Sequence, residues 1–180
     1  MKSFITFLIF LVVFLTTAEG QPQDKIAKTP KLNYDWRAGF ISITEITGGP
    51  GINFTYSPYS KYYYGITTVA GYQFTRNIKA GIGAGVHMHG DGNLYPLYLD
   101  ARYSLSAQEF VPFIAAAGGL ALKFSDIGNT WMFLNPSIGI KWVAANKLGI
   151  SLSAGLMTMS GELNRNSYVS FKLGLELKSK

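Results

Sequence analysis

The stretch 169–178 reads VSFKLGLELK, and large apolar residues alternate in it with small, polar or charged ones. Neighbouring side chains of a β-strand point to opposite faces, so one face of this stretch carries Val169, Phe171 and three leucines. The other face carries two lysines and a glutamate beside serine and glycine. This alternation predicts a β-strand with one apolar face and one polar face.

The same two-residue period recurs along the chain, in segments of roughly 10 to 14 residues that are separated by turn signals. No segment carries an apolar stripe of helical period over a helical length. The segments that we expect to form strands are 36–45, 62–75, 78–89, 94–105, 110–124, 131–143, 147–159 and 168–178. We therefore predict an all-β fold, a closed antiparallel up-and-down transmembrane β-barrel of about eight strands.

In five of these segments, 78–89, 94–105, 131–143, 147–159 and 168–178, every mid-strand charge falls on the face that is lined by glycine and serine. A soluble carrier barrel needs a strongly charged outer wall, and this polar face has too few charges for that role. We therefore expect the leucine-rich face to contact lipid and the charges to pair inside the lumen. The expected lumen network, with Arg102 as its centre, is Arg37, Lys79, Asp100, Arg102, Lys141, Lys172 and Glu176.

The connections between the expected strands alternate in length. The odd connections, near 46–61, 90–93, 125–130 and 160–167, include the two longest, and the even ones are all short. Outer-membrane barrels have short periplasmic turns and longer external loops, so both chain ends are expected on the periplasmic side. Aromatic residues near the strand ends are typical of interface girdles. Those residues are Trp36, Tyr62, Tyr64, Tyr72, Phe74, Tyr103, Trp131, Trp142 and Tyr168.

The first residues have the pattern of an export signal, with Lys2, an apolar stretch from Phe4 to Leu15, and the small residues Ala18 and Gly20. This apolar stretch is shorter than the about 20 residues that a transmembrane helix needs. The expected organisation is therefore a cleaved signal peptide at 1–20, a periplasmic N-terminal leader at 21–34 and the barrel at 35–180.

Overall charge and composition exclude several classes of function. The chain has 16 Lys and Arg against 10 Asp and Glu, but the basic residues are scattered and form no run, so we expect no nucleic-acid partner. The absence of cysteine excludes disulfides and a lipid-modified cysteine anchor. The glycines alternate along strands and precede no helix, so no phosphate-binding loop is present, and we expect no cofactor.

The sequence resembles the small outer-membrane β-barrel proteins of Gram-negative bacteria, the group of the OmpA transmembrane domain and the OmpX-like and OmpW-like barrels. The resemblance runs over nearly all of the chain after residue 20. Its carriers are Gly71–Phe74, Gly81–Gly85, Leu94–Tyr103 and Asn135–Gly139. It implies an outer-membrane location, contact with outer-membrane lipid and lipopolysaccharide, and folding by the barrel assembly machinery. Many such barrels end on an aromatic residue, whereas this chain ends on Lys180.

Few residues indicate chemistry. His87 and His89 face the same side of one strand near Asp91, which makes the three residues weak metal candidates. We favour their interpretation as polar rim residues beside a hairpin turn and expect no metal. A resemblance to lipid A deacylase barrels would need a His-x-Ser pair, and His89 stands where that serine belongs. Without a nucleophile, we predict that the protein is not an enzyme.

The loop after the first expected strand carries Phe54, Tyr56 and Tyr59, which predicts either a surface that binds a partner or an extension of the first hairpin. Eight strands enclose a lumen that side chains nearly fill, which argues against a pore. The expected function is a non-enzymatic outer-membrane barrel that serves envelope structure or surface and partner interaction, including a role as a subunit of a larger outer-membrane complex. The alternatives are a secreted lipocalin-like carrier of an apolar ligand, a lipid-modifying barrel enzyme and a narrow pore.

Overall fold

The computed structural model describes residues 34–52, 61–90, 92–106, 109–124, 130–161 and 165–179. They all belong to one compact unit, Leu32–Lys180. The expected signal peptide and all but the last residue of the expected leader lie outside the described residues. In the part of the chain that is described, no helix is long and apolar enough to cross a bilayer.

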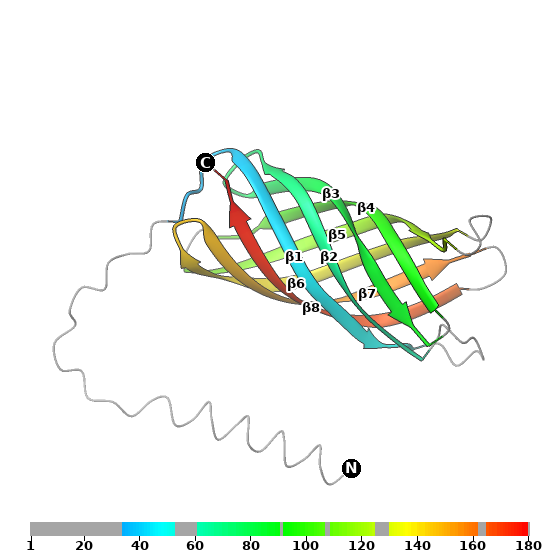
Figure 1. The fold of residues 1–180 in the computed structure, drawn as a ribbon. Helices are drawn as coiled ribbons and strands as arrows, with labels where there is room; N and C mark the ends of the chain where they lie inside the picture. The colour runs from blue at the N-terminus through cyan, green and yellow to red at the C-terminus, as the bar shows by residue number, and fades with distance from the viewer. Residues whose placement is uncertain are drawn as a thin grey trace, which may run out of the picture. The chain divides into compact units, whose positions relative to one another are not determined.

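The described residues form eight antiparallel strands that close into a barrel, with each strand paired to the next and β8 paired back to β1 (Figure 1). The strands are β1 (Gly39–Pro50), β2 (Tyr62–Gln73), β3 (Ile78–His89), β4 (Gly92–Ser104), β5 (Phe110–Leu122), β6 (Trp131–Ala145), β7 (Leu148–Ser160) and β8 (Arg165–Lys178). The expected fold, an all-β closed barrel of eight antiparallel strands, is confirmed.

The first strand differs most from its predicted range, 36–45, because β1 begins at Gly39 and continues to Pro50. The residues before it leave the sheet: the Asp35 amide donates to the Asn146 carbonyl at 2.9 Å, across the end of the barrel. At the other end of β1, a side chain on Gly49 would overlap the Val169 carbonyl of β8. Glycine there lets the two backbones approach closely, so the strand extends through a sequence that resembles a turn.

Burial alternates along the strands with the predicted phase in β3, β4, β6, β7 and β8. Leu99 and Ile138 point outward and are each 68% exposed, whereas Asp100 and Lys141 point into the lumen and are each 3% exposed. The barrel therefore has an apolar outer wall and a polar middle, as expected. β1 departs from this pattern in part, because its lumen face carries Ile41 and Ile43 beside Glu45 and Thr47.

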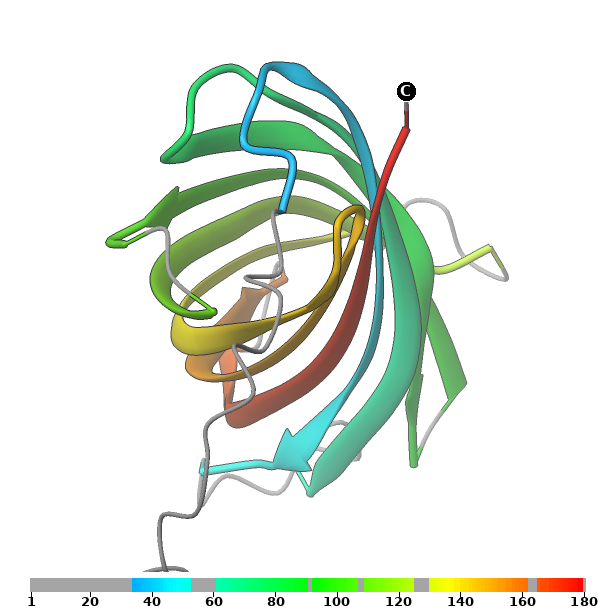
Figure 2. The same ribbon diagram turned by 90° about the vertical axis from the view of Figure 1, so that its left-hand side faces the viewer.

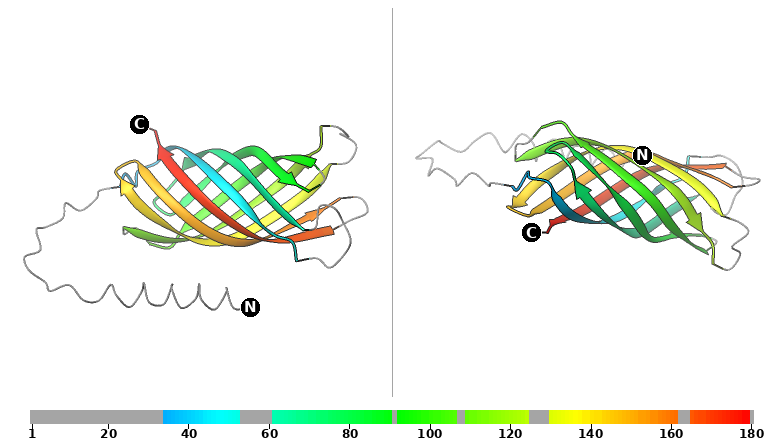
Figure 3. Two further views of the ribbon diagram at one scale, coloured as in Figure 1. Left: turned by 60° about the horizontal axis from the view of Figure 1, so that its bottom comes forward. Right: turned by 90° about the horizontal axis from the view of Figure 1, so that it is seen from above.

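Strands β2 and β3, β4 and β5, and β6 and β7 are connected at the end of the barrel where β1 begins and β8 ends, which we call the terminal end (Figure 3). The end of the barrel where β1 ends and β8 begins is called the loop end. Gly92, the first residue of β4, follows the short β3–β4 connection. Its φ of +125° is a backbone conformation that favours glycine.

Outward aromatic side chains gather toward both ends of the barrel. Phe40 contacts Tyr72, and Tyr72 contacts Phe74, with ring centroids 5.1 and 5.2 Å apart at the terminal end. Tyr62 stacks on Tyr64 at the loop end. Three aromatic residues that we expected in the girdles do not belong to them, because Trp131 and Tyr168 are buried in the lumen and Trp36 packs inside the terminal end.

Candidate functional site

The centre of the lumen holds an arginine between two carboxylates. Arg102 Nε donates to Asp100 Oδ1 at 2.7 Å, and Arg102 Nη2 donates to Asp100 Oδ2 at 3.2 Å and to Glu45 Oε1 at 3.0 Å. Asp100 and Arg102 come from β4, whereas Glu45 reaches them from β1. The three side chains are all more than nine-tenths buried. Buried charges are stable only when they are paired and hydrogen-bonded, so the three side chains keep one another in place.

A second ionic group lies nearer the terminal end and is centred on Glu176 of β8. Its Oε1 accepts from Lys79 Nζ at 2.5 Å and from Lys141 Nζ at 3.0 Å. The Tyr34 hydroxyl donates to the same oxygen. The lysine side chains come from β3 and β6, so this carboxylate connects three strands that are not neighbours in the sheet. The network therefore has two centres, Arg102 and Glu176, where the sequence predicted only the first.

The segment 34–37 covers the terminal end of the lumen, and Figure 2 shows this blue segment turning in over the barrel opening. Tyr34 is 4% exposed and packs with Val111 and Val143, while Lys141 Nζ lies 4.4 Å from the centre of its ring. Gln73 Nε2 donates to the Trp36 carbonyl at 2.9 Å. Lys178 Nζ donates to the backbone carbonyls of this segment. We call residues 34–37 the terminal cap.

Arg37 is the one predicted member of the lumen network that lies elsewhere, because its side chain is 88% exposed. Its guanidinium bonds Asp35, with Nε to Oδ1 at 2.9 Å and Nη2 to Oδ2 at 3.0 Å. Hydrogen bonds from Arg37 hold the pKa of the Asp35 carboxyl well below its usual range. The prediction was wrong because Arg37 belongs to the cap and not to a strand.

Replacing Tyr34 with phenylalanine is expected to lower the free energy of unfolding by about 1.5–3 kcal/mol, because a hydrogen bond to the buried Glu176 carboxylate is lost. Burial, and then the Glu176 charge, raise the pKa of the Tyr34 phenol well above its ordinary value. The phenol therefore stays a donor at every pH below about 10, and its contribution is lost only as pH rises through the raised pKa. Urea titrations at neutral pH measure the difference. Tyr72→Phe, a change on the outer wall, is the control and should leave stability unchanged.

Aromatic and polar side chains fill the loop end of the lumen. The Tyr63 hydroxyl donates to Ser170 Oγ at 2.6 Å and lies 2.9 Å from Thr47 Oγ1. A side chain on Gly83 would overlap the Tyr98 ring, so that glycine makes room for a lumen aromatic. The rings of His87 and His89 are 6.5 Å apart beside Tyr63.

No group of three or more His, Cys, Asp or Glu side chains that could hold a metal occurs within the described ranges. The third residue of the weak metal candidate, Asp91, lies outside those ranges, as do Phe54, Tyr56 and Tyr59. The expectation that His87, His89 and Asp91 hold no metal, and the aromatic loop as a binding surface, therefore stay predictions.

The lumen cavities next to the two ionic groups are small. One lies between the Glu176 group and Arg102, the other beside Lys172 and His87, and each has a volume of about 10 Å³. A volume of that size holds about one water molecule. Neither of these two cavities has room for an apolar ligand of the kind that a lipocalin-like carrier would hold.

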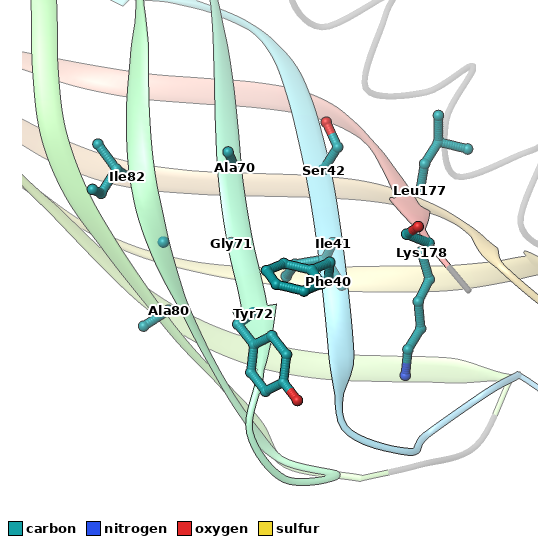
Figure 4. Close-up of a pocket in the computed structure, with 12 residues that line it drawn as sticks. Phe40, Ile41, Ser42, Ala70, Gly71, Tyr72, Ala80, Ile82, Leu177 and Lys178 are labelled. Carbon is teal, nitrogen blue, oxygen red and sulfur yellow. The ribbon is translucent and has the colours of Figure 1, made fainter.

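The outer wall is hollowed over β8, β1, β2 and β3 near the terminal end (Figure 4). The floor is made of small residues, among them Ser42, Ala70 and Ala80, and the hollow has a volume of about 610 Å³. Figure 4 shows the Phe40 and Tyr72 rings among the residues that line it. The hollow is apolar and faces away from the lumen.

Several residues of the network were missed from the sequence. Glu45 is the last residue of the predicted first segment and lies on the side of it that faces the lumen. Nothing in the sequence indicates that it pairs with Arg102. Lys178 lies on the polar face of its strand, and this position in the alternation is the only sequence feature that indicates its burial. Tyr34 was assigned to the leader, since the alternation starts after it. The structure places the other predicted members, Lys79, Asp100, Arg102, Lys141, Lys172 and Glu176, inside the lumen.

Comparison with solved structures gives the same fold. The chain is similar to Neisserial surface protein A, with a TM-score of 0.60 and 14% sequence identity over 79% of this chain and 99% of that one. It also matches the N-terminal β-barrel domain of Pseudomonas aeruginosa OprF, with a TM-score of 0.46 and 17% identity over 78% and 100% of the two chains. The outer membrane protein AlkL matches with a TM-score of 0.37 and 10% identity over 89% and 97%.

No protein-family model matches the sequence, and no curated protein matches it. These solved structures are outer-membrane β-barrels, the class that the sequence resembles. At 14% identity, the likeness to Neisserial surface protein A concerns the fold, and the two weaker matches carry no further argument.

Proposed function

We propose that this protein is a non-catalytic integral barrel of a Gram-negative outer membrane that serves envelope structure or surface interaction. The observation that carries the proposal is the distribution of polarity. Large apolar residues such as Leu99, Ile138 and Leu152 stand more than 60% exposed on the outer wall, while ionic pairs are sealed inside. Water would not stabilise that arrangement, whereas the acyl chains of a bilayer would.

The aromatic residues at both ends of the outer wall support a transmembrane orientation, because amphipathic rings favour the two membrane interfaces. The fold shared with Neisserial surface protein A is consistent with it. In this orientation the short turns and the terminal cap face the periplasm and the longer loops face outward. Acyl chains then fill the hollow over β1 and β2, and lipopolysaccharide surrounds the loop end.

Contact with the barrel assembly machinery during folding, and a role as a subunit of a larger outer-membrane complex, follow from the same placement as further parts of the proposal. The closed lumen leaves surface interaction and envelope structure as the roles that fit best, since side chains occupy the path that a pore would use. Envelope fractionation followed by crosslinking identifies the partner class.

Spin labels at Leu99, Ile140 and Leu173 test the orientation. These residues come from β4, β6 and β8 and are all exposed on the outer wall. We expect each label, in protein folded into lipid vesicles, to collide with oxygen dissolved in the acyl region and not with a water-soluble nickel complex. A label at Phe124, close to the loop end, serves as the interface control. Labels at the three wall positions that respond to the nickel complex would exclude the membrane assignment.

A further inference from the structure

Two polar atoms inside the barrel are buried without a partner. The Nδ1 atom of His87 and the Oδ1 atom of Asn135 make no hydrogen bond within the described part of the chain, and both residues are at least 95% buried. Burying a polar group without a hydrogen bond is unfavourable, and buried polar atoms of folded proteins are mostly bonded to protein or to ordered water. These two atoms therefore require a partner that the strands do not supply.

Neighbouring hydrogen bonds hold the Asn135 amide in one orientation. Its Nδ2 donates to Ser170 Oγ at 3.2 Å, and the same Oγ accepts from the Tyr63 hydroxyl at 2.6 Å. The amide nitrogen is thus engaged with β8, and Oδ1 is the atom that is left over. An amide oxygen can only accept, so its partner must be a donor, whereas an imidazole nitrogen either donates or accepts.

A cavity lies against both residues. His87 of β3 and Asn135 of β6 line it together with Lys172 of β8, Thr47 and Thr67. Its volume of about 10 Å³ suits one water molecule, and cavities that stay empty in proteins are apolar, whereas an ammonium group, an imidazole, an amide and hydroxyls meet here. The other small cavity, in the second ionic group, has none of the unpartnered atoms in its lining.

The charges beside this cavity already match. Arg102 bonds the carboxylates of Glu45 and Asp100. The same two carboxylates also attract the Lys172 ammonium group, so two cations face two anions. A neutral occupant is therefore favoured over an ion, and it has to offer protons as well as accept them.

We propose that one structural water molecule occupies the cavity between His87, Asn135 and Lys172. The water donates to Asn135 Oδ1, accepts from the Lys172 ammonium group and bonds His87 Nδ1 through its remaining proton or lone pair. It supplies a partner for both buried atoms. It also connects β3, β6 and β8, and so forms a third polar centre of the lumen next to the Arg102 group.

A crystal structure of the protein in detergent, at a resolution that shows ordered water, tests the site. We expect one density peak in the cavity, about 2.7–3.2 Å from Asn135 Oδ1, His87 Nδ1 and Lys172 Nζ. A cavity without density, surrounded by well-ordered side chains, would overturn the proposal. The test needs no membrane, so its outcome is independent of the proposed location.

Two variants assign the peak to these partners. Asn135→Leu removes the acceptor and should remove the water. Ala117→Ser is a milder change: Ala117 also lines the cavity, and a hydroxyl there should take the place of the water, so the separate peak should disappear. The matched control is Ala121→Ser, since Ala121 is buried in the lumen on the same strand but does not line the cavity, and the peak should stay. A peak that persists in both Asn135→Leu and Ala117→Ser would contradict the assignment.

Discussion

Replacing Glu176 with glutamine is expected to destabilise the folded barrel by about 3–5 kcal/mol, the usual effect of removing one partner from a buried ion pair. The amide has nearly the shape of the carboxylate, so the loss comes from charge. Lys79 and Lys141 would both lose their negative partner while they stay about 97% buried. Urea unfolding of protein folded into lipid vesicles, followed by the fluorescence of the three tryptophans, measures the change.

Two further variants separate charge from side-chain shape. The double variant Glu176→Gln with Lys79→Met removes one charge of each sign, so it should recover a large part of the lost stability. Glu109→Gln changes an exposed carboxylate at the rim and should shift stability by less than about 0.5 kcal/mol. Equal unfolding of Glu176→Gln and the unchanged protein would show that this carboxylate does not hold the two lysines.

The alternation of residue types predicted most of the fold because lipid and lumen impose opposite demands on adjacent side chains. In β8, every second residue from Phe171 to Leu177 faces outward, as the sequence indicates. The prediction was weakest where residues that face the lumen are themselves apolar. Ile41 and Ile43 lie on the lumen side of β1, within an apolar cluster that includes Val69 and Tyr98. The lumen is polar at its middle but apolar in places, and single-strand patterns do not show where the change occurs.

The sequence predicted which charges are buried more accurately than which of them pair. Strand phase alone places Asp100, Arg102 and Glu176 on the inner face. Pairing depends on the stagger of the eight strands and on which strands face one another across the lumen, as for Glu45 and Arg102. Tyr34 and Arg37 show the same limit, because nothing in a strand pattern predicts that the chain before β1 covers the terminal end. The network could therefore be predicted as a set of residues, but its two centres could not.

The outer wall should tolerate an arginine at its edge but not at its middle. Leu99 lies near the centre of β4, between Ile82 of β3 and Gly118 of β5, and is 68% exposed. Leu99→Arg should destabilise the barrel in vesicles by about 2–4 kcal/mol, because the charge enters the acyl region at the midplane of the bilayer. Leu177→Arg, close to the end of β8, should change stability by only about 0–1 kcal/mol, since the side chain reaches the interface.

Comparing the stability change at the two positions distinguishes an outer wall that contacts lipid from one that contacts water more directly than either variant alone. Both leucines point outward and both substitutions add the same group, so propensity and size effects largely cancel in the comparison. Water would solvate an arginine at either position, and a soluble barrel would accept both with less than about 0.5 kcal/mol of change. Urea unfolding of the two variants in vesicles therefore measures where the acyl region begins. Equal stabilities would mean that position 99 contacts water, and the sealed charges of the lumen would then need another explanation.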